Sequence, residues 1–535
     1  MAETKPARSA QREELVRQLV GAALRAGDVA EAERLLRMRL SRVPGDVDAL
    51  AALADIAARS GRIPEATALF HQALGLAPEA HGIRLQLSAL HQEQSHFPFA
   101  LKLLREVPAE QRKSFEIKAR EAALLGSLGQ RDGEIAIYDD LLKDQPRDAR
   151  LWMSLGNALN YAGRTDEAVK ALRKATKLAP RYGEPWWSLA NLKSYPFDDR
   201  DIKALQSALR DDLAPVDALH FHFALGRAFE VRGDYPTSFD HYAAGNRLRS
   251  ASLNLGKVRV TPYVDEAVKT FTSELFERNR DAGAKSEEPI FIVGLQRSGS
   301  TLIEQILASH PAIEATAELM TMQHLWEEHV ARATDLRTNP LAALSQMEPE
   351  AFTEIGEEYL VRTRAFRQLG RPRFIDKLPA NWMNVGLIRL ALPNAKIIDA
   401  RRHPLACGWS NFKQHYATGV TFAYSLESIG HFYTDYLRLM DHFERVQPGA
   451  ILHVIHEKLV DDPEAEIRRM LDFLELEFDP SCLDFHKSKR AVQTPSAEQV
   501  RRPITREGLE AWRNYQPWLE PLRLSLGCAL EDWRN

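Results

Sequence analysis

Apolar and polar positions in the first half of the chain repeat with the spacing of paired amphipathic helices. Glycines recur at intervals of 34 residues or twice that, at Gly27, Gly61, Gly129 and Gly163, and Ser95 stands at the omitted position. Prolines form a second ladder in the same frame: Pro44, Pro78, Pro146 and Pro180. Two ladders with one period predict stacked helix pairs, in which a proline ends the second helix of each unit.

From residue 289 the pattern changes to short strand-like runs, mostly apolar, that alternate with amphipathic stretches. The strand-like runs are 290–293, 373–375, 396–400 and 452–455. This alternation predicts an α/β domain with a mainly parallel sheet and a ligand at the carboxyl ends of its strands. We therefore expect an all-α superhelix of repeats over residues 1–250, a linker or docking segment over 251–288, and the α/β domain over 289–535.

The period of 34 residues resembles that of the tetratricopeptide repeat. Residues 152–180 match its pattern best, and the last two units before residue 250 are irregular, so we expect them to pack against the next domain. Such arrays present a concave surface to peptides or partner proteins. Capture of a protein or peptide acceptor and a scaffolding role, including a homodimer, are both open.

Composition and charge narrow the classes of function. The chain has 535 residues, 44% apolar and 27% charged, with a formal net charge of −4, which argues against a nucleic-acid binder. Its three cysteines form no CxxC pair, so we expect neither a zinc site nor another metal. The amino terminus lacks a secretory apolar core and no run approaches the roughly twenty apolar residues of a membrane span. These features predict a cytoplasmic protein without a membrane span.

A glycine-bounded turn follows the apolar run 290–293 and leads into a helical pattern. Its spacing matches the phosphate-binding P-loop at Gly294, Gly299 and Thr301. Backbone NH groups in such a turn, and those at the start of the next helix, favour an anion. Ser300 occupies the position of the P-loop lysine, which makes γ-phosphoryl transfer a poor fit. Arg297 inside the turn offers a replacement cation.

A second basic stretch follows the run 396–400, where Arg402 precedes Ser410 by eight residues. The two stretches together resemble the 5′-phosphosulfate loop and the 3′-phosphate clamp of sulfotransferases, whose donor is 3′-phosphoadenosine-5′-phosphosulfate (PAPS). This resemblance implies that the donor is bound by the following residues: Gly294, Arg297, Ser298, Gly299, Ser300, Thr301, Arg402 and Ser410.

Past residue 288 the chain is similar to tyrosylprotein sulfotransferases, and its whole layout looks like bacterial proteins that join tetratricopeptide repeats to such a domain. The resemblance implies Glu318 as the catalytic base and Lys377 as the catalytic lysine. It also places Ser496 and Arg502 in a late donor-binding segment. His456 stands where the family usually has a donor-binding tyrosine, so that contact is open.

These residues predict a PAPS-dependent sulfotransferase. Sulfuryl transfer requires in-line alignment and stabilisation of charge on the leaving phosphate, which Lys377 and Arg297 can supply without a metal. Glu318 would take the acceptor proton, with His310 as a competing base. A phenol with a pKa near 10 suits a carboxylate base, which favours tyrosine. Open alternatives are a glycan or small phenol as acceptor, a P-loop phosphotransferase, and a repeat scaffold with a non-catalytic nucleotide-binding domain.

Overall fold

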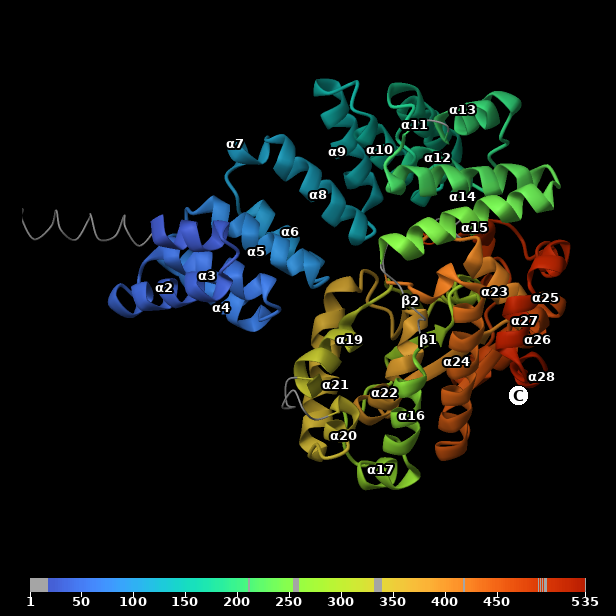
Figure 1. Cartoon of the computed structure of the whole chain (residues 1–535). Helices are drawn as coiled ribbons and strands as arrows, with labels where there is room; N and C mark the ends of the chain where they lie inside the picture. Colours follow the sequence, from blue (N-terminus) through green and yellow to red (C-terminus); the bar gives the residue numbers. More distant parts are fainter. Residues whose placement is uncertain are drawn as a thin grey trace, which may run out of the picture. The chain divides into compact units, whose positions relative to one another are not determined.

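The computed structural model describes residues 18–209, 212–253, 259–331, 339–416, 419–488, 490, 492, 494 and 498–534. The chain forms two compact units, Met1–Gln130 and Arg131–Asn535. Figure 1 shows the chain coloured along the sequence, with helices alone in the first unit and a sheet in the second.

The first unit is built from helical hairpins. Its helices are α2 (Val29–Arg42), α3 (Val47–Arg59), α4 (Ile63–Leu76), α5 (His81–Glu93), α6 (Phe97–Arg105), α7 (Ala109–Arg112) and α8 (Phe115–Ser127). The turn inside each hairpin needs a left-handed residue, and Gly27 and Gly61 supply it with φ of 77° and 74°. Ser95 adopts φ of 56° at the position without a glycine. The glycine positions that recur in the sequence are therefore the turns between paired helices.

The second unit begins with further hairpins, so the predicted helix pairs are confirmed in both units. Its first helices are α9 (Arg131–Asp144), α10 (Ala149–Tyr161), α11 (Thr165–Leu178), α12 (Glu184–Asn191), α13 (Asp199–Leu209), α14 (Pro215–Val231) and α15 (Tyr235–Ser252). The last pair packs on the domain that follows, as its irregular sequence predicts. Asn246 donates to the carbonyl oxygen of Phe412 at 2.8 Å, and the hydroxyls of Ser238 and Tyr515 lie 2.9 Å apart.

Two helices, α16 (Thr261–Thr270) and α17 (Ser273–Arg278), lie between the repeats and the sheet. The α16 helix is tied to the α/β domain, because Thr261 donates to Asp435 at 2.7 Å and Tyr263 donates to the carbonyl oxygen of Met383 at 2.6 Å. The segment 251–288 thus contains helices that dock on the sheet domain. The domain borders at residues 250 and 288 stay predictions.

A five-stranded parallel sheet in the order β2-β3-β1-β4-β5 forms the centre of the second domain. The strands are β1 (Pro289–Gly294), β2 (Ile313–Ala315), β3 (Arg373–Lys377), β4 (Lys396–Arg401) and β5 (Ile451–Ile455). The four predicted strand-like runs are confirmed as β1, β3, β4 and β5. The short edge strand β2 was not predicted.

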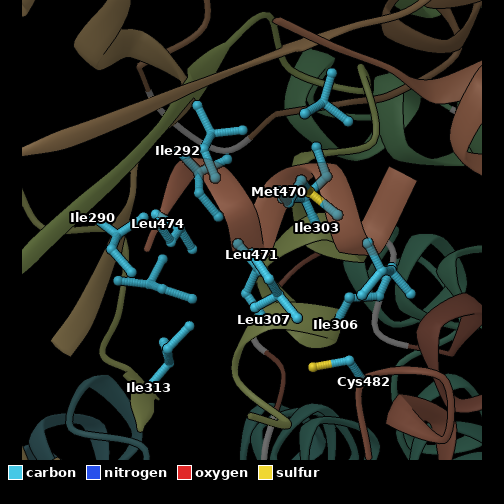
Figure 2. Packing of buried hydrophobic residues seen from close by; sticks show 14 of the residues in the cluster. Ile290, Ile292, Ile303, Ile306, Leu307, Ile313, Met470, Leu471, Leu474 and Cys482 are labelled. Atoms are coloured by element: carbon cyan, nitrogen blue, oxygen red, sulfur yellow. The ribbon is translucent and has the colours of Figure 1, made fainter. Parts of the chain in front are cut away.

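Helices cover both faces of the sheet. They are α18 (Ser300–Leu307), α19 (Thr321–Leu325), α20 (Pro340–Leu344), α21 (Pro349–Thr363), α22 (Val385–Ala391), α23 (Pro404–Phe412), α24 (Leu426–Val446), α25 (His456–Asp461), α26 (Pro463–Phe473), α27 (Glu520–Leu526) and α28 (Ala529–Asp532). Figure 2 shows one face, where Ile290 and Ile292 of β1 lie in a buried cluster with Ile303 of α18 and Met470 of α26. This apolar packing fixes α18, and with it the turn before it, against β1.

Candidate active site

Four parallel strands deliver the predicted site residues to one edge of the sheet. The turn that starts at Gly294 follows β1, and Lys377 ends β3. Arg402 directly follows β4, and His456 directly follows β5. Because these strands are parallel, their carboxyl ends meet at the same edge, where open α/β sheets bind ligands.

The turn after β1 has a backbone that only glycine accommodates at two places. Gly294 has φ of 135°, and a Cβ there would lie 2.5 Å from the carbonyl oxygen of Ala400. Gly299 has φ of 104°, and a Cβ there would lie 2.7 Å from Nδ1 of His456. Arg297 adopts φ of 69°, a left-handed conformation that costs a non-glycine residue about 1–2 kcal/mol. Together these conformations wrap the backbone into a cradle before the first turn of α18.

Arg402 and Ser410, which are predicted to hold a 3′-phosphate, lie beside this cradle. Nε of Arg297 donates to the Ser410 hydroxyl at 3.0 Å. Arg402 donates through Nη1 to the carbonyl oxygen of Arg297 at 3.4 Å and through Nη2 to that of Gly508 at 2.8 Å. The neighbouring Arg401 turns the other way into the core, where its fully buried side chain donates to Asp399 at 2.7 Å. Only the second arginine of the pair therefore faces the cradle.

A chain of ionic contacts crosses the site on its other side. Nζ of Lys377 contacts the Glu318 carboxylate and lies 3.8 Å from that of Glu304, which is also ion-paired with Arg490. The side chain of Lys377 is 3% exposed, whereas that of Glu318 is 49% exposed. Burial lowers the pKa of Lys377, but the two glutamates outweigh it and hold this pKa above its ordinary value. Lys377 is therefore cationic at neutral pH, and half of the Glu318 side chain is exposed to solvent.

Buried polar atoms around the cradle lack hydrogen-bond partners within the described part of the chain. They are Oγ of Ser298, Nε of Arg402 and Nδ1 of His456. An unpaired buried polar atom costs about 1–3 kcal/mol. A ligand with several oxygen atoms would remove this cost, because all three groups can donate hydrogen bonds to it.

His456 replaces the expected tyrosine with a neutral ring. Burial, and then the positive charge of Arg402, lowers its pKa to about 3. A neutral imidazole carries one NH donor, so His456 can still donate to a phosphate oxygen at neutral pH.

Three other predicted groups have different surroundings. Ser496 lies outside the described residues. Arg502 has an exposed side chain that is ion-paired with Glu498 at 2.7 Å. Both ring nitrogens of His310 are engaged, since Nδ1 accepts from the amide of Ala312 at 3.1 Å and Nε2 lies 3.1 Å from the carbonyl oxygen of Glu477. This leaves His310 unsuited to act as a base.

Sequence reasoning missed several residues of the site. Arg490 and Glu304 support Lys377, and Thr494 lies 3.4 Å from Thr301 through their hydroxyl oxygens. Glu304 carried a signal, because a carboxylate on the apolar helix after a phosphate cradle is buried only with a cationic partner. Arg490 and Thr494 carried none, since their spacing from the cradle follows no local pattern.

No cluster of three or more His, Cys, Asp or Glu side chains suited to a metal ion occurs among the residues that the structure describes. Within those same residues, no helix has both the length and the apolarity to cross a membrane.

Family models match both halves of the chain. Residues 289–480 match the sulfotransferase family model. Residues 18–81 and 124–183 match the tetratricopeptide repeat model.

Individual relatives match the chain over different lengths. An uncharacterized protein of Aquifex aeolicus (strain VF5) is 31% identical over 402 residues, which cover 72% of this chain and 51% of that protein. The chain thus spans about half the length of that relative. A putative protein-tyrosine sulfotransferase of Caenorhabditis briggsae is 26% identical over 231 residues, 42% of this chain and 81% of that protein. The sulfotransferase domain of the Synechococcus PCC 7002 olefin synthase is 27% identical, with a TM-score of 0.31, and covers 43% of this chain and 89% of that domain.

Proposed function

We propose that this chain, in which tetratricopeptide repeats precede a sulfotransferase-family domain, transfers a sulfuryl group from PAPS to a tyrosine hydroxyl of a protein or peptide. The observation that carries the proposal is the position of Lys377 at the edge of the sheet that bears the phosphate cradle. Its buried ammonium group is shared between the open Glu318 and the buried Glu304. A base and a leaving-group cation are thus adjacent.

The donor would lie across the cradle. The backbone NH groups after Gly294 and the start of α18 would hold the 5′-phosphosulfate, with Ser300 and Thr301 at the helix start. Arg402 and Ser410 would hold the 3′-phosphate, and His456 would donate to a phosphate oxygen. The unpaired Ser298, Arg402 and His456 atoms support this fit, because each gains a partner from an anionic ligand.

The chemical step needs one base and one cation site. The acceptor oxygen forms a bond to sulfur as the bond from sulfur to the 5′-phosphate oxygen breaks, and Glu318 takes the acceptor proton. Negative charge then builds on the departing phosphate, where Lys377 and Arg297 stabilise it. The products are the sulfated acceptor and adenosine 3′,5′-bisphosphate. We propose that no metal takes part.

Two arguments support tyrosine as the acceptor: the acidity of a phenol and the similarity to a relative with that name. A phenol releases its proton to a carboxylate more easily than an alkyl alcohol does. The Caenorhabditis briggsae relative carries the name of a putative protein-tyrosine sulfotransferase. We also propose that the repeats help to hold the acceptor, and that the protein works in the cytoplasm, since Cys407, Cys482 and Cys528 are all free thiols.

Calorimetric titration tests the donor class. The full chain should bind adenosine 3′,5′-bisphosphate more tightly than ADP, and Arg402→Ala should weaken the bisphosphate by about tenfold to a hundredfold. Arg523→Ala, which removes an exposed arginine paired with Glu520, is the matched control and should leave affinity unchanged. Equal binding of ADP, or binding of neither nucleotide, would contradict the proposal.

A further inference from the structure

A segment of the helical repeats contacts the α/β domain beside the predicted donor-binding residues. This segment, residues 191–194, begins at the last residue of α12 and contacts the α/β domain at two points. The side chain of Gln414 donates to that of Asn191 at 3.3 Å, and the amide of Ser194 donates to the Glu498 carboxylate at 3.2 Å. Lys193 lies between these anchors, so its backbone is held beside the carboxyl end of α23.

Cations outnumber carboxylates in the ionic cluster around this segment. Lys413, which follows α23, donates to Glu230 at 2.6 Å, and Arg227 pairs with the same carboxylate at 3.1 Å. Arg227 also donates to the carbonyl oxygen of Lys193 at 3.0 Å. Glu230 is therefore already shared by two cations.

The ammonium group of Lys193 has no hydrogen bond or ion pair to any described residue. Burial lowers the pKa of Lys193 well below its ordinary value, and the positive charges of Arg227, Arg297 and Lys413 lower it further. Because like charges repel in a partly buried site, such a cluster stores unfavourable energy that a bound anion would relieve.

The position of the cluster indicates what that anion is. Arg297 donates to Ser410 at 3.0 Å, and Lys413 follows Ser410 by three residues, close to one helical turn. The cations therefore gather near Ser410, where the 3′-phosphate of the donor would lie. The proposed base Glu318 is not part of this group, because it contacts Lys377.

We propose that Lys193 of the repeats, together with Lys413, forms an oxyanion subsite that binds the 3′-phosphate of the donor. This inference rests on the proposed function and deepens it, because it makes the repeats part of the donor site. A carboxylate of the acceptor could supply the same kind of anion. The experiment therefore distinguishes an acceptor carboxylate from the 3′-phosphate of the donor.

The test compares Lys193→Met with Lys203→Met in the full chain. Lys203 lies exposed on α13 and is the matched control. Loss of one charged contact should weaken adenosine 3′,5′-bisphosphate about tenfold or more, while adenosine 5′-monophosphate, which lacks the 3′-phosphate, binds unchanged. Lys193→Arg should retain most of the affinity. Lys193→Met should melt no lower than wild type, since an unpaired charge is removed, whereas loss of a merely structural residue would lower its melting point.

The other possible results also decide whether the subsite exists and which anion it binds. Unchanged bisphosphate affinity with a raised KM for an acidic tyrosine peptide would assign the oxyanion to the acceptor. If neither value changes, the subsite is overturned. If wild type binds no bisphosphate, the proposed function fails. The subsite is then tested with inorganic phosphate, which should raise the melting point of wild type and not that of Lys193→Met. Equal stabilisation of both proteins would overturn it.

Discussion

Glu230 connects the repeats to the catalytic domain, and its removal has a magnitude that can be worked out. Its side chain is 11% exposed and accepts from Lys413, Arg227 and the hydroxyl of Tyr242. Burial raises the pKa of Glu230, but Lys413, Arg227 and Lys193 outweigh burial and lower the pKa to about 2. The gap from the ordinary value of 4.5, at about 1.4 kcal/mol for each pKa unit, corresponds to about 3 kcal/mol of stability at neutral pH.

Glu230→Gln keeps the shape of the side chain and removes its charge. With an unfolding entropy of about 2 cal/mol/K per residue, a loss of 3 kcal/mol should lower the melting temperature of the unit Arg131–Asn535 by about 4 °C. The difference should be constant between about pH 6 and 8. It should shrink as the pH falls from 4.5 towards 2, because a carboxylate with a depressed pKa loses its stabilising effect only in that window.

Differential scanning calorimetry of wild type, Glu230→Gln and Glu167→Gln measures this effect. Glu167 is the control, since its carboxylate is 52% exposed and pairs with Arg164 on the surface, where solvent screens an ion pair. A Glu230→Gln protein that melts with wild type at pH 7 would refute the reasoning, because the repeats would then not depend on this carboxylate for docking.

Three further predictions follow from single residues. Glu318→Gln should keep its affinity for adenosine 3′,5′-bisphosphate in calorimetry but lose sulfate transfer from radiolabelled PAPS by about 100-fold or more; retained turnover would exclude Glu318 as the base. Between pH 7 and pH 5, His456→Phe should lose about 2 kcal/mol less of its free energy of unfolding than wild type does. The reason is that His456, with a pKa of about 3, stays neutral in the folded protein, whereas in the unfolded chain it binds a proton below about pH 6.5. Urea titrations at both pH values measure the two losses, and equal losses would contradict the prediction. Ser95→Gly should stabilise the first unit by about 1 kcal/mol, since glycine adopts φ of 56° without strain; an unchanged or lower urea midpoint would contradict it.

The strands that build the site could be predicted because buried parallel strands are continuous apolar runs. The runs within β1, β3, β4 and β5 are three to five residues long and are followed by glycine or polar residues. The strand β2 escaped prediction since it has only three residues, and one of them is Glu314, whose buried carboxylate pairs with Arg367 at 2.9 Å. A strand of this length with a charged residue at its centre leaves too few apolar positions to detect.

The contacts that support the site could not be predicted, because they join distant parts of the chain. Lys193 precedes Arg297 by more than one hundred residues, and contacts of the repeats with the α/β domain, such as that of Ser194 with Glu498, bring the two near each other. Arg401 and Arg402 are neighbours in sequence, yet strand alternation sends the first into the core and leaves the second at the cradle. Sequence patterns thus identify strand ends, while tertiary packing selects which charges act there.

The pairing of Lys377 with Glu318 links the two halves of the proposed reaction. In the proposed reaction, the Lys377 ammonium is in contact with the Glu318 carboxylate before the donor binds. As charge builds on the leaving phosphate, the same ammonium interacts more strongly with that phosphate and less with Glu318. In the proposed reaction, the Glu318 carboxylate is thereby released from Lys377 when the acceptor oxygen must lose its proton. Glu304, fixed by Arg490, keeps Lys377 at the edge of the sheet during this exchange, so a shift of one cation couples leaving-group stabilisation to base catalysis.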